Sequence, residues 1–281
     1  MHFDFANASY QEADYIIVGI PYDRSSSFVP GNRFGPAFAR IASMNVESYS
    51  PYFQKDLNSL NIHDAGDLNL LFSSTKQTFT QIQRSIRKHL LKNKRVLVVG
   101  GEHTITIPIV HELSRHYPNL YLIQLDAHSD TRDELLGDKY SHATVIKRIR
   151  EFLPEKRIYQ LGLRSTTSPQ ENPQQYLFSV QKYLDNIQKH IGRNPCYLTL
   201  DIDVLDCGIF PAVQTPVPNG ISYQELFNSI IKLSKSNIIG CDIVEYNPMI
   251  SNSLTYASVI AEIIRELILM MSQSQFKYAP K

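Results

Sequence analysis

Six short apolar runs, separated by longer amphipathic segments, constrain the fold of this 281-residue chain more than any other feature. Each run is five to seven residues long, rich in β-branched or aromatic residues, and apolar on both faces of an extended chain. Such runs are typical of parallel strands that are covered by helices on both sides. The runs are YIIVGI (15–20), RVLVV (95–99), LYLIQL (120–125), RIYQL (157–161), CYLTL (196–200) and IIGCDIV (238–244).

The segments between these runs have the spacing of amphipathic helices, which we predict over 75–92, 107–116, 143–152, 177–191, 222–234 and 253–271. Ser222 followed by Glu225 matches a capping box, and Pro36 suits the first turn of a further helix after a loop that begins near residue 25. Strands that alternate with helices predict an α/β fold with three layers, α/β/α. We expect a single domain over residues 1–281, built on a central, mostly parallel sheet of about eight strands.

Composition argues against several classes of function. The formal net charge is +1 and no long basic block appears, so neither nucleic acid nor a membrane is an expected partner. The apolar stretch 258–271 is interrupted by Glu262, Arg265 and Glu266, which predicts an amphipathic surface helix rather than a membrane span. Three widely spaced cysteines, and an N-terminus without the pattern of a secretory signal, favour the reducing cytoplasm.

Three polar clusters each follow directly after one of the predicted buried strands. If the chain stays extended there, its period of two turns the carboxylates and imidazoles of one cluster to the same side. Because the carboxyl ends of parallel strands meet at one edge of a sheet, the three clusters should converge. They are GGEH with His103, DAHSD with Asp126, His128 and Asp130, and DID with Asp201 and Asp203.

These clusters predict a binuclear metal site. Four aspartates and two histidines are costly to gather away from water unless cations neutralise them. Charge counting supports two divalent ions, because four carboxylates then balance four positive charges. Mixed carboxylate and imidazole ligands suit Mn²⁺, with Zn²⁺, Ni²⁺, Co²⁺ and Fe²⁺ as alternatives. Two ions about 3.5–4 Å apart lower the pKa of a shared water, so we predict a metal-dependent hydrolase.

Two further residues carry possible chemistry. His142 follows Asp130 by twelve residues and could transfer protons near neutral pH, or it could be a surface histidine at the start of a helix. Glu245 directly follows the last apolar run. A carboxylate at that point could accept a planar guanidinium through paired hydrogen bonds, or it could be a solvated charge at a strand end.

These motifs, in this order, resemble the ureohydrolase family, which includes arginases and agmatinases. The pieces GGEH, DAHSD, DID and DIVE match the family pattern over residues 13 to 265, and PGNRFGPAFAR is similar to the family's early Gly-Pro loop. The resemblance implies an arginase-like fold and hydrolysis of a guanidino group to urea and an amine. It also implies one Mn²⁺ bound by His103, Asp126, Asp130 and Asp201, and a second bound by Asp126, His128, Asp201 and Asp203.

The same resemblance implies roles for other residues. Asp130 would help to pass a proton to the leaving amine, and His142 would act as an acid or base. Glu245 would hold the guanidinium of the substrate. The resemblance further implies that the chain forms homo-oligomers, either trimers or hexamers.

The loop after DAHSD looks more like that of agmatinases than that of arginases, and it favours agmatine, which would yield putrescine and urea. Asp133 and Glu134 in this loop should favour a substrate with a cationic tail over one with a carboxylate. These acids could instead face solvent. Thr215, in the loop after the DID strand, is also expected to contact the substrate.

The loop that contains Thr215 departs from the agmatinase pattern GTGTPEPGG. Gln214, Val217 and Asn219 stand where that pattern has Gly, Glu and Gly, and the bulkier Gln214 should alter the pocket wall. Other guanidino or amidino hydrolases therefore stay open: guanidinobutyrase, formimidoylglutamase, arginase and guanidine hydrolase.

Two readings outside this group are weaker. An inactive metal-binding homologue that acts as a regulatory subunit should have lost a ligand or Glu245, and all are present. A single-zinc deacetylase of related architecture needs fewer ligands than the six in this chain.

Overall fold

A computed structural model describes residues 1–71, 74–167, 175–251 and 254–273. Its centre is an eight-stranded sheet with the order β4-β1-β5-β10-β9-β6-β7-β8, and neighbouring strands pair in parallel throughout. A separate antiparallel hairpin joins β2 (Tyr49–Ser50) to β3 (Lys55–Asp56). The strands of the sheet are β1 (Tyr15–Ile20), β4 (Ile62–Asp67), β5 (Arg95–Gly100), β6 (Tyr121–Leu125), β7 (Ile158–Leu163), β8 (Gln175–Leu177), β9 (Cys196–Asp201) and β10 (Ile238–Val244).

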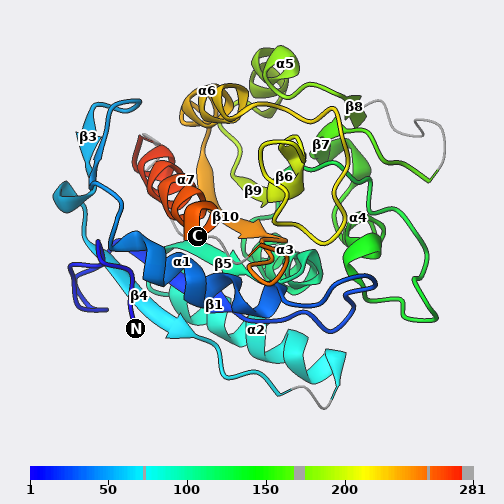
Figure 1. Ribbon diagram of the computed structural model, residues 1–281, viewed down its shortest axis with the longest axis horizontal. Coiled ribbons are helices and arrows are strands. Elements are labelled where there is room, and N and C mark those ends of the chain that lie inside the picture. The colour runs from blue at the N-terminus through cyan, green and yellow to red at the C-terminus, as the bar shows by residue number, and fades with distance from the viewer. Residues whose placement is uncertain (72–73, 168–174, 252–253, 274–281) are drawn as a thin grey trace.

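Helices cover both faces of the sheet (Figure 1). Alternate residues of β5 divide between two hydrophobic cores: Leu97 and Val99 pack in one, and Val96 and Val98 pack in the other. The first core is closed by α1 (Gly35–Ser43), α5 (Gln181–Ile191), α6 (Tyr223–Leu233) and α7 (Leu254–Gln273). The second is closed by α2 (Thr75–Leu90), α3 (Thr106–His116) and α4 (Val145–Ile149). The predicted three-layer α/β/α architecture is confirmed.

Local sequence explains where the helices begin. The Ser74 hydroxyl accepts a hydrogen bond from the Gln77 amide and caps α2, whose buried stripe then repeats every four residues at Ile82, Ile86 and Leu90. The Ser222 hydroxyl caps α6 in the same way. Its expected capping-box partner, Glu225, instead accepts hydrogen bonds at the start of α5, from the Val180 and Gln181 amides. The capping-box interpretation is therefore only half right.

All six predicted strands are present, and the sheet has two more. β4 has the sequence IHDAGD, whose polar residues hide it from a search for apolar runs. β8 takes up Leu177, so α5 begins at Gln181 rather than at 177. The predicted helix 143–152 is reduced to Val145–Ile149 after a short 3₁₀ turn, and the predicted first residue of the last helix, Ser253, lies outside the described residues.

The last helix, α7, corrects the expectation of a surface helix. Its residues from Ile263 to Met271 are all buried, and α1 packs along it. Arg265 and Glu266 are buried as an ion pair of 2.8 Å, with Glu266 also accepting from the Ser50 hydroxyl and Arg265 donating to the Glu47 carbonyl. Charged residues thus enter the core because each finds a partner there. None of the described helices combines the length and apolar character that a bilayer crossing demands.

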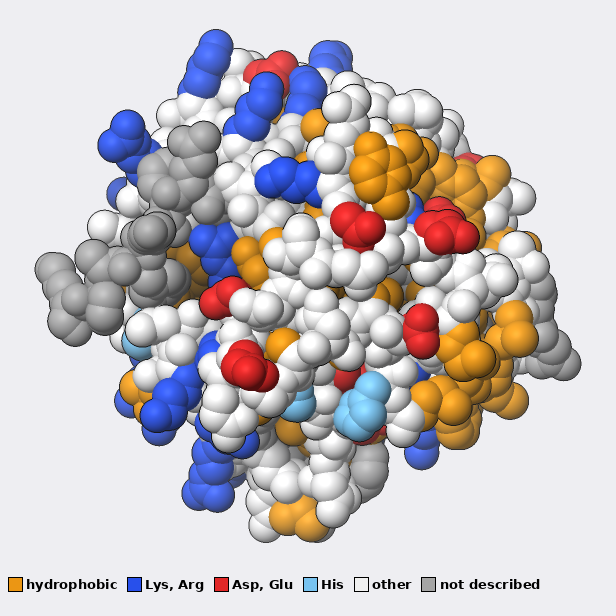
Figure 2. Space-filling model, turned by 90° about the vertical axis from the view of Figure 1, so that its left-hand side faces the viewer, with side chains coloured by type: hydrophobic (Ala, Val, Ile, Leu, Met, Phe, Trp, Pro, Cys, Tyr) orange, Lys and Arg blue, Asp and Glu red, His pale blue; other side chains and the backbone are white. Residues whose placement is uncertain are grey.

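The surface that carries the N-terminal segment and the β2–β3 hairpin mixes side chains of all kinds (Figure 2). Lys and Arg gather towards one edge of this view, hydrophobic side chains towards the other, and Asp and Glu lie between them. Exposed hydrophobic residues of this region include Met44 at the end of α1 and Tyr49 in the hairpin. Both signs of charge occur on this face, in keeping with the net charge of +1.

Candidate metal centre

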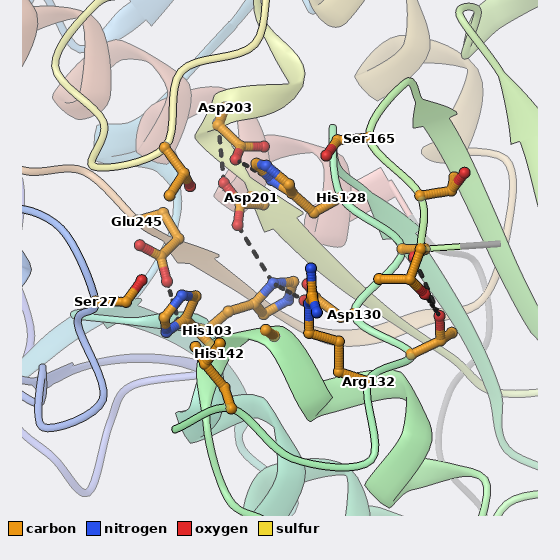
Figure 3. Close-up of a pocket in the computed structure, with 17 residues that line it drawn as sticks. Ser27, His103, His128, Asp130, Arg132, His142, Ser165, Asp201, Asp203 and Glu245 are labelled. Atoms are coloured by element: carbon orange, nitrogen blue, oxygen red, sulfur yellow. Dashed lines mark hydrogen bonds and ion pairs between the residues drawn. The ribbon is translucent and has the colours of Figure 1, made fainter. Parts of the chain in front are cut away.

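The six predicted ligands come together at the carboxyl ends of neighbouring central strands. Asp201 is the last residue of β9, the turns after β5, β6 and β9 carry the other five residues, and the turn after β10 carries Glu245. All except Asp126 line a pocket at this edge of the sheet, and Figure 3 shows His103, His128, Asp201 and Asp203 pointing towards one another from different elements. These residues are up to 142 positions apart in the sequence, and the parallel topology of the sheet brings them close together in space.

Hydrogen bonds beneath the pocket fix the tautomer of His103. The Thr199 hydroxyl donates to Asp242 at 2.6 Å, so it accepts from the ring of His103, whose Nε2 lies 2.9 Å away. Nε2 therefore carries the ring proton, and Nδ1 presents its lone pair to the pocket. Asp242 also accepts from Tyr197 and Thr106, each at 2.9 Å, which leaves this buried carboxylate well satisfied.

The lone pair of His103 faces three carboxylates. Its Nδ1 lies 3.1 Å from Asp126 Oδ2, 3.1 Å from Asp130 Oδ2 and 3.3 Å from Asp201 Oδ2. This nitrogen is buried and has no hydrogen-bond partner among the described residues. An unprotonated nitrogen and three carboxylate oxygens around one point form a donor set that a divalent cation would satisfy.

A second donor group adjoins the first. Ligand atoms of Asp126, His128 and Asp203 lie within 4.8 Å of one another, and His128 Nδ1 is 2.8 Å from Asp203 Oδ2. Asp126 belongs to both groups, since its two oxygens face different histidines. Two adjacent donor groups with a shared carboxylate fit two ions better than one.

The ligands converge through turns, so the expectation of an extended chain is wrong in detail. Asp130 adopts a positive φ of 52°, and its carbonyl accepts from the Ile146 and Lys147 amides at the start of α4. Asp201 caps a single 3₁₀ turn (Ile202–Val204) that contains Asp203, and the Asp203 amide donates to the Asp201 carboxylate at 2.9 Å. The carboxylates meet because these turns fold them back, and the strands fix only where the turns begin.

Electrostatics also indicate a shortage of positive charge. Burial raises the pKa of Asp130 to about 7 and raises that of Asp201 well above its usual value. Burial disfavours a protonated His128, but the adjacent Asp203 outweighs it and raises the pKa of His128 to about 10. Burial likewise disfavours ionised Asp203, yet His128 lowers its pKa to about 2. Asp203 thus draws a proton onto His128, as expected of a donor set built for cations.

Glu245 is buried and held by three donors. It follows β10 with a φ of 67°, and its amide donates to the Gly101 carbonyl. The His103 amide donates to Oε1 at 2.7 Å, while the side chains of Gln214 (at 2.9 Å) and Asn32 donate to Oε2. Burial raises the pKa of Glu245 to about 7. The reading of a solvated strand-end charge is excluded, since only 3% of the residue is exposed.

The Gln214 side chain therefore contacts Glu245 instead of projecting into the pocket. It is fully buried, and its amide group reaches the carboxylate directly. Its neighbour Thr215 lines the pocket, a position from which the expected substrate contact could be made. Val217 is half-buried, and Asn219 adopts a positive φ of 65°, a conformation that Asn tolerates better than most residues.

His142 lies in the pocket at the start of a 3₁₀ turn (His142–Thr144), on the side of Glu245 and Ser27 (Figure 3). Its amide donates to the Ser25 hydroxyl at 3.0 Å, and its Nδ1 lies 3.1 Å from the same oxygen. Burial lowers the pKa of the ring below the usual value. This histidine is half-buried, so the alternative of an ordinary surface histidine does not describe its position.

Asp133 and Glu134 point elsewhere. Asp133 is 80% exposed and pairs with Lys147 at 3.1 Å and Arg148 at 3.8 Å, and Glu134 is exposed. Neither acid is among the described residues that line the pocket, so the pocket lining gives no support to their expected contact with a cationic tail. From the same loop, Arg132 and Leu135 line the pocket instead. Hydroxyl groups complete the wall: Ser27, Ser129, Thr131, Ser165, Thr166, Thr167 and Thr215.

Sequence reasoning missed Arg164, which directly follows β7 and supports the site. Its guanidinium donates to six main-chain carbonyls at 2.7 to 3.3 Å: those of residues 162, 203, 204, 205, 217 and 218. It therefore ties the turn that carries Asp203 to the loop that carries Thr215. A lone arginine after an apolar run gave no signal of this role, because its partners are carbonyls from distant segments.

Comparisons with known proteins agree with this geometry. A model described as the arginase family matches residues 13–270. The agmatinase of Bacillus subtilis is 34% identical over 275 residues, which cover 95% of each chain. A solved structure of a candidate agmatinase from Clostridium difficile has a TM-score of 0.90 and 35% identity, and covers 94% of this chain and 99% of its own. The agmatine ureohydrolase of Thermoplasma volcanium has a TM-score of 0.87 and 29% identity, covering 97% and 94%.

Proposed function

Because the chain belongs to the arginase family, we propose that it is a metal-dependent ureohydrolase that converts agmatine and water to putrescine and urea. The observation that carries the proposal is the convergence of His103 with three carboxylates beside a buried Glu245. The choice of agmatine rests on relatives named agmatinase that align over nearly the whole chain.

Two Mn²⁺ ions are the proposed cofactors. His103, Asp126, Asp130 and Asp201 would hold one, and Asp126, His128, Asp201 and Asp203 the other, a division supported by the two donor groups around Asp126. Bound there, the ions would supply a water of lowered pKa and neutralise charge on the reacting group. Zn²⁺, Ni²⁺, Co²⁺ and Fe²⁺ would meet the same ligand types.

The protein's own residues would handle orientation and protons. Glu245, fixed by the His103 amide and the Gln214 side chain, would accept N–H groups of the guanidinium and hold its carbon above the ligands. Asp130 would pass a proton towards the leaving amine, which departs poorly as an anion. His142, at the pocket wall, would exchange that proton with solvent.

A second substrate class is favoured by one observation. Arg132 is the one Arg or Lys among the described residues of the pocket lining, and hydroxyl groups make up much of the remaining wall. This chemistry would accept a carboxylate better than an ammonium group. A guanidino acid such as 4-guanidinobutyrate is therefore the rival to agmatine.

The test is urea release from agmatine, 4-guanidinobutyrate and arginine after reconstitution with Mn²⁺ or Ni²⁺. We expect the highest kcat/KM for agmatine. A Glu245→Ala variant serves as the negative control. Faster turnover of 4-guanidinobutyrate would show that this acid, and not agmatine, is the preferred substrate. Absence of urea from every compound with both metals would refute a ureohydrolase.

Other properties follow from this proposal. We expect a cytoplasmic enzyme of polyamine synthesis, consistent with three free cysteines. We also expect a homo-oligomer, a trimer or hexamer, supported by exposed hydrophobic residues such as Phe28 and Met249. Analytical ultracentrifugation would test the oligomer, and a monomer at micromolar concentration would refute it.

A further inference from the structure

Ser25, in the loop after β1, lies between a buried carboxylate and the pocket histidine. Its amide donates to Glu102 Oε2 at 2.7 Å, and its hydroxyl donates to Glu102 Oε1 at 2.8 Å. The same hydroxyl lies 3.0 Å from the His142 amide and 3.1 Å from His142 Nδ1. No sequence motif pointed to Ser25, and its distance from His142 in the chain is 117 residues.

Counting protons around Ser25 Oγ assigns the direction of each hydrogen bond. The Thr104 hydroxyl donates to Glu102 at 2.6 Å, so it has no proton to offer Ser25. When Glu102 is ionised, it can only accept, and Ser25 gives its one hydroxyl proton to this carboxylate, the acceptor at the shorter distance. Its lone pairs are then left for the two N–H groups of His142. The ring nitrogen Nδ1 must carry a proton to make its contact, and Nε2 is left unprotonated.

The loop itself is held in place, which gives this contact a fixed geometry. Asp23 is buried and accepts from the Gly31 amide at 3.0 Å, closing the loop on itself. The Glu102 amide donates to the Tyr22 carbonyl at 2.7 Å. Gly101 makes this approach possible, since a Cβ there would lie 1.9 Å from the same carbonyl. Ser25 is thus tied to the turn that carries the ligand His103.

We propose that Ser25 is a positioning residue for His142: it binds the main-chain and ring N–H groups together and sets the ring as the Nδ1–H tautomer. Nε2 is then the nitrogen available to exchange a proton in the pocket. The inference rests on the proposed function for its catalytic meaning, but the tautomer is a property of the resting protein and is measured without any substrate.

The first test is spectroscopic. Long-range ¹H–¹⁵N spectra of histidine-labelled protein, loaded with diamagnetic Zn²⁺, separate the two tautomers, and a His142→Asn variant assigns the signals. We expect His142 as the Nδ1–H tautomer in the parent chain. In Ser25→Ala we expect a mixture of tautomers, and in Ser25→Thr, which keeps the hydroxyl, the parent pattern. A parent spectrum with Nε2–H would overturn the proposal by itself, even where Ser25→Ala failed to fold.

The second test is kinetic, with a matched control. Thr104→Val removes a donor to the same Glu102 but leaves the Ser25–His142 contacts in place. We expect Ser25→Ala to lower kcat about tenfold or more with little change in KM, because the lost orientation affects proton transfer rather than binding. Ser25→Thr should restore most of kcat. Equal losses in Ser25→Ala and Thr104→Val would show that only packing around Glu102 matters, and would also overturn the proposal.

Failure of the proposed function gives a different result. If no guanidino compound is hydrolysed, the spectra still show which ring nitrogen of His142 carries the proton. If agmatine is hydrolysed but the tautomer is Nε2–H, the proposed function stands and the role of Ser25 is lost.

Discussion

The hydrogen bond from His103 to Thr199 offers a sharp test of how the metal centre is built. Thr199→Val keeps the size and β-branching of the side chain in a strand that is buried throughout, so the sheet should be preserved. The change removes the acceptor at 2.9 Å from Nε2 of His103. It also removes one of the three donors to Asp242, while Tyr197 and Thr106 remain.

The magnitude follows from burial. His103 is 1% exposed, so its Nε2–H has no access to water as a replacement partner. Leaving a buried donor unsatisfied costs about 1–3 kcal/mol, which corresponds to about 5- to 150-fold in an equilibrium constant. Without this acceptor, the tautomer that carries its proton on Nε2 and leaves Nδ1 unprotonated is no longer stabilised. Loss of such a supporting hydrogen bond typically weakens metal binding about 10- to 100-fold, in the same range.

The assay is a competition between the protein and a fluorescent chelator for Mn²⁺, supported by thermal melts with and without the metal. We expect Thr199→Val to bind Mn²⁺ about 10- to 100-fold more weakly, and Thr199→Ser to bind like the parent chain. Thr106→Val is the matched control, because Thr106 contacts Asp242 and lies 3.4 Å from Thr199 without a hydrogen bond to His103. Parent-like affinity in Thr199→Val would refute the argument that this contact sets the tautomer.

Three further changes test other parts of the structure. Glu245→Gln should lower kcat/KM about 10- to 100-fold, since a charge-assisted hydrogen bond contributes about 1.5–3 kcal/mol; steady-state kinetics would measure it, and a change below twofold would contradict the role. Arg164→Met leaves carbonyls in two loops without their donor, so we expect a loss of about 2–4 kcal/mol in the free energy of unfolding. Chemical denaturation would measure this loss, and a curve that matches that of the parent chain would refute the supporting role of Arg164. Burial lowers the pKa of His89 to about 4, below its unfolded value near 6.5, so the folded state binds fewer protons and stability should fall by about 2 kcal/mol as pH drops from 6.5 towards 4. Denaturation in EDTA at several pH values would measure this slope, which should be smaller by that amount in His89→Gln.

Local sequence accounts for most of the framework. Apolar runs such as RVLVV are buried on both faces because both rows of their side chains are hydrophobic and gain stability away from water. All six runs form strands of the sheet. β4 was missed because an edge strand needs fewer apolar residues, and its Asp64 is paired with Arg40 of α1, a contact that no local pattern contains. The same reason explains α7, whose Arg265 and Glu266 signalled solvent but lie paired in the core.

By itself, the sequence determined the candidate ligand set, because carboxylates and imidazoles directly after buried parallel strands must meet at one edge of the sheet. Only the tertiary structure decided how they meet. Asp130 has a positive φ, and the Asp203 amide turns back to bind the Asp201 carboxylate. The contact between Thr199 and Asp242 on adjacent strands determines which ring nitrogen of His103 faces the pocket without a proton. The tertiary structure also directed Asp133 to solvent and Arg132 to the pocket. Side-chain direction in a loop depends on contacts between distant segments, which residue types and their spacing do not contain.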